Sequence, residues 1–319
     1  MSSSQAGRVV RDVRFDRLVP GEATMELLAD GTIWGEGPVY LPDADAVLWT
    51  DLPNDRVLRW SAVDGVRDFY RPSDVANGQT LDLDGRVLAC EHATRRISRH
   101  EPDGSRTTVV DRYEGKRLNS PNDLIVASDG AIWFTDPPLG ILDDVYGRKA
   151  ESELGYSYIF RLDRARDELK IMTGVALTIT TGILVDPNGL ALSPDESTLY
   201  VTDTSVSRFE AGNHHILAFD VLDGPSLGTP RVFAVIEPGF CDGIRVDAEG
   251  NVWASAGDGV HVLDPDGVEL GRILTPEPVG NLTFGGPDGR RLFIAATSSL
   301  WSIQVGVRGA ATPWAGETA

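Results

Sequence analysis

Six short strings in the chain carry a polar residue of the same kind in the same local setting. In each string an Asp, Glu or Asn stands directly before an apolar run, and four of the six are followed by Gly. The six residues are Glu36, Asn77, Asn122, Asn188, Asp242 and Asn281. Carboxylate and carboxamide oxygens are the ligands that hard divalent cations prefer, and Ca²⁺ accepts roughly six to eight of them. If the strings converge in space, the sequence predicts a ring of oxygen atoms that holds such a cation.

Turn chemistry is the competing interpretation of each string taken alone, because Asn-Gly and Asp-Gly pairs commonly connect strands. Six strings in one setting, two of them charged, favour the ring, since carboxylates crowded without a cation would repel one another. Zn²⁺ prefers His or Cys ligands and Mg²⁺ prefers a tighter octahedron. We therefore expect Ca²⁺ as the cofactor, with Zn²⁺, Mg²⁺ and Mn²⁺ as the alternatives.

The elements that must position these residues form a repeat. Six segments join an acidic or Gly-rich turn to alternating apolar residues, the pattern of two antiparallel strands, and a further strand follows most of them. These segments are 41–51, 81–92, 126–137, 192–204, 246–256 and 285–297. Short strands, dense turns and no helical periodicity predict an all-β fold, a six-bladed β-propeller with four-stranded antiparallel blades. We expect the N-terminal strand, near residues 9–18, to close the ring beside residues 300–305.

The whole chain, residues 1–319, is expected to form this single domain. Within it we expect residues 1–8 to be disordered. The stretch 137–158 is longer than a hairpin loop and rich in Gly and charged residues. We interpret this stretch as a lid over one mouth of the channel.

The propeller also predicts a second set of polar residues behind the first. The first strand of each blade lines the channel, so the six residues should ring one mouth. Counting 14 or 15 residues onward reaches the end of the second strand at the same mouth, where Asp51, Glu91 with His92, Asp136 and Asp203 stand. This predicts an incomplete outer acidic ring, with Asp136 and Asp203 behind the metal site. For His92 a structural role competes with that of a proton shuttle.

Composition restricts the partners. Asp and Glu number 48 against 29 Lys and Arg, which gives a net charge of −19. Such a surface repels nucleic acid and anionic membranes. No apolar run approaches the roughly 18 residues of a membrane span, and the N-terminus lacks the apolar stretch of a signal peptide. Two cysteines make no disulfide framework. We expect a cytoplasmic protein, a monomer or small homo-oligomer, that acts on a small molecule.

Four strings carry a family resemblance. WGEGPVY, LNSPNDLIVASDGAIWFTDPPLG, DPNGLALSPDESTLYVTDT and CDGIRVDAEGNVWAS resemble the family of senescence marker protein, gluconolactonase and luciferin-regenerating enzyme. The resemblance implies a six-bladed propeller with one catalytic divalent metal, usually calcium, near the channel mouth. The family's metal ligands match Glu36, Asn188 and Asp242, and Asn122 matches the asparagine that reaches the metal or the substrate. These four positions also belong to the predicted ring.

The expected activity is a metal-dependent hydrolase that opens a sugar lactone such as gluconolactone by the attack of water. Asp242 is the expected base, because it can contact both metal and water, and Asp203 or Asp136 in the outer ring is the alternative base. Asn122, Asn77, Arg117 and His92 are the expected substrate-binding residues. Two alternatives stay open: hydrolysis of organophosphates or other esters at the same site, and a non-hydrolytic propeller that resembles strictosidine synthase or only binds a ligand.

Overall fold

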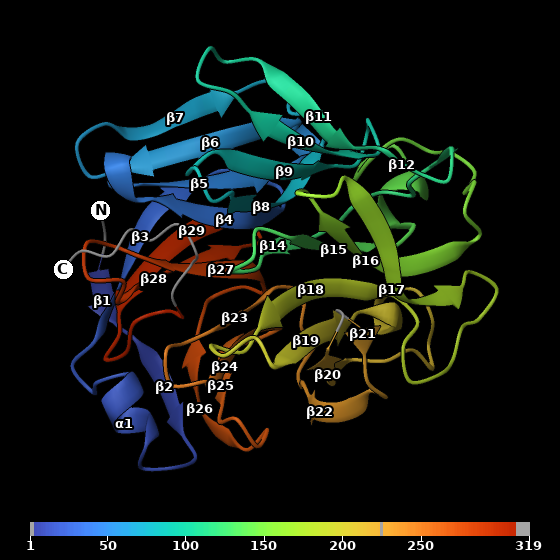
Figure 1. The fold of residues 1–319 in the computed structure, drawn as a ribbon. Helices are drawn as coiled ribbons and strands as arrows, with labels where there is room; N and C mark the ends of the chain where they lie inside the picture. Colours follow the sequence, from blue (N-terminus) through green and yellow to red (C-terminus); the bar gives the residue numbers. More distant parts are fainter. Residues whose placement is uncertain (1–2, 224–225, 311–319) are drawn as a thin grey trace.

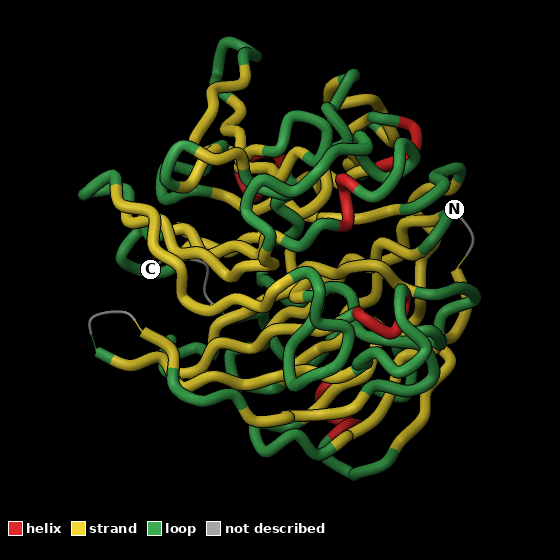
Figure 2. Tube along the Cα trace, turned by 90° about the vertical axis from the view of Figure 1, so that its right-hand side faces the viewer, coloured by secondary structure: helices red, strands yellow, loops and turns green. Residues whose placement is uncertain are grey.

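A computed structural model describes residues 3–223 and 226–310 of the protein. Its strands form six antiparallel sheets arranged in a ring, with one additional two-stranded hairpin (Figure 1). The predicted all-β, six-bladed propeller is therefore confirmed. Within the described ranges, helical structure is confined to α1 (Phe15–Leu18) and a few short 3-10 turns, which are red among the yellow strands in Figure 2. Among the described helices, none has the length and apolarity that a membrane crossing requires.

In blades one to three, four strands follow one another along the chain from the channel outward. Blade one contains β4 (Gly35–Leu41), β5 (Ala46–Asp51), β6 (Arg56–Ser61) and β7 (Gly65–Tyr70). Blade two contains β8 (Ala76–Leu81), β9 (Val87–Glu91), β10 (Arg96–His100) and β11 (Arg106–Val110). The hairpin of β12 (Arg112–Tyr113) and β13 (Lys116–Arg117) leads to blade three, which contains β14 (Leu124–Val126), β15 (Ile132–Asp136), β16 (Tyr156–Asp163) and β17 (Glu168–Ala176).

Blades four to six each contain five of the described strands, and in blades five and six the outer strands come from the N-terminal region. Blade four contains β18 (Pro187–Leu192), β19 (Thr198–Asp203), β20 (His215–Leu222), β21 (Ser226–Leu227) and β22 (Arg231–Val235). Blade five contains β23 (Ile244–Val246), β24 (Val252–Ala256), β25 (Gly259–Leu263), β26 (Glu269–Leu274) and β2 (Gly7–Val10). Blade six contains β27 (Val279–Gly285), β28 (Arg291–Ala296), β29 (Ser299–Gln304), β3 (Thr24–Asp30) and β1 (Ser3–Gln5).

A strand from the N-terminal region closes the ring, as predicted, but it is not the expected one. Strand β3 pairs antiparallel with β29, with Met25 opposite Ile303. The expected position near residues 9–18 is wrong. Strand β2 pairs with β26 of blade five instead, and the apolar residues Phe15 and Leu18 are buried on the short helix α1.

The expectation of disorder over residues 1–8 also differs from the structure. Residues 3–5 and 7–10 form β1 and β2, each hydrogen-bonded to a neighbouring strand. Residues 1–2 lie outside the described part of the chain. The N-terminal region therefore adds outer strands to two neighbouring blades.

The hydrophobic core is divided among the six interfaces between neighbouring blades, with one cluster of buried side chains in each. Alternation along a strand sends successive side chains to opposite faces of the sheet. In β5, for example, Trp49 packs in the cluster between blades six and one, whereas Leu48 packs between blades one and two. Because both faces of each sheet are buried, the polar residues at the inner strand ends are held in a rigid frame.

Candidate active site

The predicted ring residues lie at irregular steps in the innermost strands. Four of these strands shift register with the second strand of their blade, at Glu36–Val39, Ala76–Gln79, Pro187–Leu190 and Val279–Asn281. A β-bulge of this kind bends a strand and turns a side chain away from its regular direction. Asn122 and Asp242 stand two residues before β14 and β23 begin. All six ring residues thus occupy places where the regular ladder is broken.

Polar contacts connect each of the six ring positions to the next. Backbone hydrogen bonds join Gly78 N to Asn122 O at 2.9 Å, and Gly189 N to Asp242 O at 3.1 Å. The other links are Gln79 Nε2 to Gly37 O, Thr135 Oγ1 to Asn188 O, Gly243 N to Gly280 O, and Asn281 Nδ2 to Glu36 Oε2. The structure therefore brings all six strings together, as the ring prediction requires.

Glycine after a ring residue permits this close approach. A Cβ atom at Gly189 would lie 2.2 Å from Asp242 O, and one at Gly37, where φ is +48°, would lie 2.1 Å from Asn77 O. Both distances are far shorter than any real Cβ contact. These glycines lie within strands β18 and β4, so they serve the packing of neighbouring inner strands and do not mark turns.

Glu36 is buried with one carboxylate oxygen unsatisfied. Its Oε2 accepts hydrogen bonds from Gly37 N at 2.9 Å and from Asn281 Nδ2 at 3.0 Å. Its Oε1 is fully enclosed and has no hydrogen-bond partner in the described part of the protein. Burial raises the pKa of Glu36 from 4.5 to about 7. An enclosed carboxylate oxygen without a donor is a position at which a cation would be stabilising.

Asp242 carries a carboxyl group whose pKa is influenced by its neighbours Glu36 and Asn188. Burial raises the pKa of Asp242 well above its ordinary value, and the nearby charge of Glu36 raises it further. The backbone N–H of Asp242 donates to Ser255 Oγ at 2.8 Å, which fixes the residue in place. On the other side, Asn188 Nδ2 donates to Thr204 Oγ1 at 3.3 Å, so its Oδ1 is left to accept.

The charges at the ring fit a divalent cation. A third buried carboxylate, that of Asp123, lies near Glu36 and Asp242 and influences the pKa of both. Asp123 Oδ2 has no hydrogen-bond partner among the described residues and lies 3.7 Å from Arg245 Nη1. If a cation kept all three carboxylates ionised against their raised pKa values, they and the guanidinium would leave two negative charges, which a divalent cation would balance. In the described part of the chain no group of three or more His, Cys, Asp or Glu could hold a metal. The candidate donor set instead combines two carboxylates with carboxamides, which suits a hard ion.

Asp123 and Arg245 are members of this charge group that the sequence interpretation missed. Asp123 directly follows Asn122 in the string NSPND, and Arg245 follows the string CDGI. Position next to a ring residue was thus an available signal for Asp123. Nothing local to Arg245 indicates that it lies beside Asp123, because the two residues come from different blades.

His92 contacts the ring through Asn77. Its Nε2 lies 3.3 Å from Asn77 Nδ2, and its Nδ1 lies 2.6 Å from the carbonyl oxygen of Tyr146. Burial lowers the pKa of His92 to about 4, so its imidazole is neutral at pH 7. The structural interpretation of His92 accordingly fits the geometry better than that of a proton shuttle.

Arg117 contacts the same region less directly. Its Nη2 donates to Thr94 O at 2.7 Å, and its backbone N–H donates to Glu153 Oε2 at 2.8 Å. These bonds tie the β12–β13 hairpin to the turn that follows His92 and to the stretch 137–155, which precedes β16. No hydrogen bond joins Arg117 to a ring residue among the described residues, and its contact with substrate stays a prediction.

The predicted outer acids lie at the expected strand ends, and their carboxylate oxygens accept hydrogen bonds from backbone N–H groups. Asp136 Oδ2 and Oδ1 accept from the backbone N–H groups of Asn119 and Ser120, at 2.8 and 2.9 Å. Asp203 accepts from Val185 N at 2.6 Å and Asp186 N at 3.2 Å. Burial raises the pKa of Asp136 to about 7. Both carboxylates therefore hold the segments that lead to Asn122 and Asn188, and neither has a free oxygen to act as a base.

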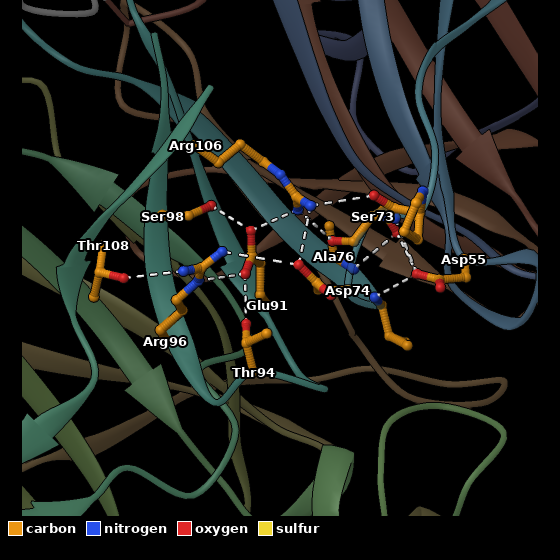
Figure 3. Close-up of polar contacts among 12 residues, drawn as sticks. Asp55, Ser73, Asp74, Ala76, Glu91, Thr94, Arg96, Ser98, Arg106 and Thr108 are labelled. Carbon is orange, nitrogen blue, oxygen red and sulfur yellow. Dashed lines mark hydrogen bonds and ion pairs between the residues drawn. The ribbon is translucent and has the colours of Figure 1, made fainter. Parts of the chain in front are cut away.

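Asp51 and Glu91 are likewise fully buried and hydrogen-bonded. Asp51 accepts from Ile33 N at 3.0 Å, just before β4. Glu91 binds two guanidinium groups, Arg96 Nε at 2.6 Å and Arg106 Nη1 at 2.8 Å, in the network shown in Figure 3. Arg106 also donates to Ser73 O, which links this network to the segment before β8. The outer acids are thus anchors for the inner strands.

Glu91→Gln is expected to lower the free energy of unfolding by about 2 kcal/mol, the value of charge-assisted hydrogen bonds lost while the shape is kept. Urea unfolding measures this change. The matched control is Glu168→Gln, which removes the exposed Lys170 pair and should change stability by less than about 0.5 kcal/mol. Equal losses in the two variants would contradict the anchoring role of Glu91.

The chain is similar in sequence and in structure to known lactonases. The chain is 32% identical over 330 aligned residues to the gluconolactonase of Zymomonas mobilis, covering 95% of this chain and 88% of that protein. It is 31% identical over 268 residues to a pentonolactonase of Haloferax volcanii, covering 82% and 80%. The structure of a gluconolactonase from Xanthomonas campestris superposes with a TM-score of 0.86 at 38% identity, covering 96% of this chain and 98% of that one.

A sequence model of the SMP-30/Gluconolactonase/LRE-like region matches residues 34–298. This range includes all six ring residues, from Glu36 to Asn281. The resemblance expected from the four strings is therefore confirmed, and the chain belongs to the SMP-30/gluconolactonase/LRE-like family.

Proposed function

We propose that this protein is a calcium-dependent lactonase that opens a sugar lactone such as gluconolactone. The observation that carries the proposal is the pair of crowded, buried carboxylates of Glu36 and Asp242 at the inner strand ends, with Glu36 Oε1 unsatisfied. The relatives named gluconolactonase and pentonolactonase support the same class of substrate.

Glu36, Asn188 and Asp242 would hold the cation, with Asn122 as the fourth member of the donor set. Only oxygen donors are present in this set, which favours Ca²⁺ over Zn²⁺. Bound there, the cation would supply Lewis-acid polarisation of the lactone carbonyl. The inner-strand bulges and the hydrogen bonds between neighbouring ring residues keep these side chains in place before any ligand binds.

Asp242 is the proposed base. Water attacks the carbonyl carbon of the lactone, and the Asp242 carboxylate accepts a proton from that water. The ring C–O bond then breaks, and the proton passes from Asp242 to the departing oxygen, which gives the open hydroxy acid. Asp242 is the better candidate because the oxygens of Asp136 and Asp203 are occupied by backbone N–H groups.

A panel of lactones assayed by proton release tests the proposal. We expect hydrolysis of aldonolactones such as gluconolactone, loss of activity after EDTA treatment, and recovery when calcium is added back. Parallel additions of Mg²⁺, Mn²⁺ and Zn²⁺ identify the metal, and a phosphotriester tests the alternative substrate class. Full activity of the chelator-treated, metal-free enzyme would contradict the metal dependence, and turnover of esters but no lactone would contradict the substrate.

A further inference from the structure

The hydrogen bonds of His92 determine its tautomer and the orientation of Asn77. A backbone carbonyl only accepts, so His92 Nδ1, at 2.6 Å from Tyr146 O, must carry the proton. The neutral ring then leaves Nε2 as an acceptor. Asn77 must therefore present its NH₂ group to Nε2, at 3.3 Å. The side-chain oxygen of Asn77 is thereby directed away from His92.

That oxygen is free to receive a donor. Asn77 Oδ1 accepts no hydrogen bond from the described residues. It is also not enclosed by them, so solvent reaches this oxygen. Asn77 lies on β8, the innermost strand of its blade, so the solvent that reaches Oδ1 is that of the channel. An amide oxygen in this position has the capacity to accept a hydrogen bond from a hydroxyl group of a ligand.

The stretch 137–155 holds His92 from the other side. A Cβ atom at Gly140 would lie 2.4 Å from His92 Cγ, so the imidazole packs directly against the glycine backbone. Gly140 N in turn donates to Ser120 Oγ at 2.9 Å, within the string that carries Asn122. His92 thus stands between this stretch and Asn77, with both imidazole nitrogens engaged and its Cγ packed against Gly140.

We infer that His92 is a positioning residue, which fixes Asn77 so that its Oδ1 binds a hydroxyl group of a polyhydroxylated lactone. His92 itself does not touch the substrate. This inference rests on the proposed function for the class of ligand, and it assigns the selection of hydroxylated rings to the Tyr146–His92–Asn77 chain of hydrogen bonds.

Two conservative variants separate the two hydrogen bonds of His92. His92→Gln keeps an acceptor near the position of Nε2, whereas His92→Asn keeps a donor near Nδ1 and loses the acceptor for Asn77. The probe is gluconolactam, a non-hydrolysable hydroxylated analogue, titrated by calorimetry into the calcium-loaded protein. We expect His92→Asn to weaken binding about tenfold, the value of one hydrogen bond, and His92→Gln to stay within about threefold of the parent.

A double-mutant cycle shows whether His92 acts through Asn77. Asn77→Ala should weaken binding by as much as His92→Asn, and the double variant should bind no more weakly than Asn77→Ala alone.

With gluconolactone as substrate, His92→Asn should raise KM about tenfold and change kcat less than twofold. His215→Asn is the matched control, because His215 Nε2 also tethers a mouth segment, at 2.8 Å from Ile183 O, without contacting a ring residue. It should bind the lactam like the parent.

Several outcomes would overturn the inference: additive effects in the cycle, equal losses in the Gln and Asn variants, or no binding of gluconolactam by the parent. ¹⁵N NMR of the parent supplies a test that needs no variant, because a proton on His92 Nε2 at pH 7 would also overturn it. If the lactam binds with the expected pattern but no lactone is hydrolysed, the proposed function fails and the positioning role stands.

Discussion

Asp242→Asn is expected to lower kcat for lactone hydrolysis about a thousandfold, even when calcium saturates the site. General bases contribute roughly 10² to 10⁴ to a rate, and the amide keeps the shape of the side chain but cannot accept a proton from water. Steady-state kinetics at increasing calcium concentrations measure the effect. The hydrogen bond from Asp242 N to Ser255 Oγ is made by the backbone and should persist, so the variant should fold.

Glu36→Gln is the matched control for this experiment. It also removes one negative charge without changing shape, and it keeps a carbonyl oxygen at the ring. Its expected defect is weaker calcium binding, so its kcat should recover substantially at high calcium. Equal recovery of the two variants would mean that Asp242 is a ligand only. The base would then have to be sought outside the predicted residues, because the carboxylate oxygens of Asp136 and Asp203 accept from backbone N–H groups and both ring nitrogens of His92 are engaged.

Calcium is expected to stabilise the protein by at least about 3 kcal/mol more at pH 8 than at pH 4.5, because the raised pKa of Asp242 adds to the effect of Glu36 in the same direction. In the cation-free protein the pKa of Glu36 is raised from 4.5 to about 7 by burial. Between these values the folded state binds more protons than the unfolded state, so stability is fully present below pH 4.5 and is lost as the pH rises through 7. The difference of the two pKa values corresponds to about 3 kcal/mol. A bound cation favours the ionised carboxylate and removes this loss.

Unfolding by urea at pH values from 4.5 to 8, with chelator-stripped and calcium-loaded protein, measures the effect. Asp136, whose pKa burial also raises to about 7, contributes the same slope to both samples and cancels in their difference. Glu36→Gln should reduce the slope of the stripped protein. Parallel pH profiles for the stripped and loaded protein would contradict a cation site at Glu36.

The ring of inner-strand residues could be predicted because its signal is local and repeats in every blade. An Asp, Glu or Asn before an apolar run marks where a strand leaves the channel mouth, and Gly189 or Gly37 beside it permits the approach of the next blade. The conclusion that Glu36 and Asp242 meet needs only the number of blades and the assumption that they form a closed ring.

Other features depend on contacts that no local pattern encodes. The residues around Phe15 and those around Met25 are both apolar and near the N-terminus, and only pairing with β29 selects the latter as the closing strand. Sequence spacing placed Asp136 at the correct strand end, but the direction of its side chain depends on the unpaired N–H groups of Asn119 and Ser120. The contact of His92 with Tyr146 depends on the path of a loop, for which the sequence has no periodic signal.

Closure of the ring by β3 and β29 has a consequence for protein synthesis. About 270 residues separate Asp30 from Ser299. At a translation rate of roughly 5–20 residues per second, the ribosome needs on the order of 15 to 50 s to make them. During that time strand β3 can pair with β1 but lacks β29, against which Met25 and Leu28 are buried in the finished protein. The nascent chain must therefore carry an exposed apolar segment until its last blade emerges, and this segment is where we expect molecular chaperones to bind it.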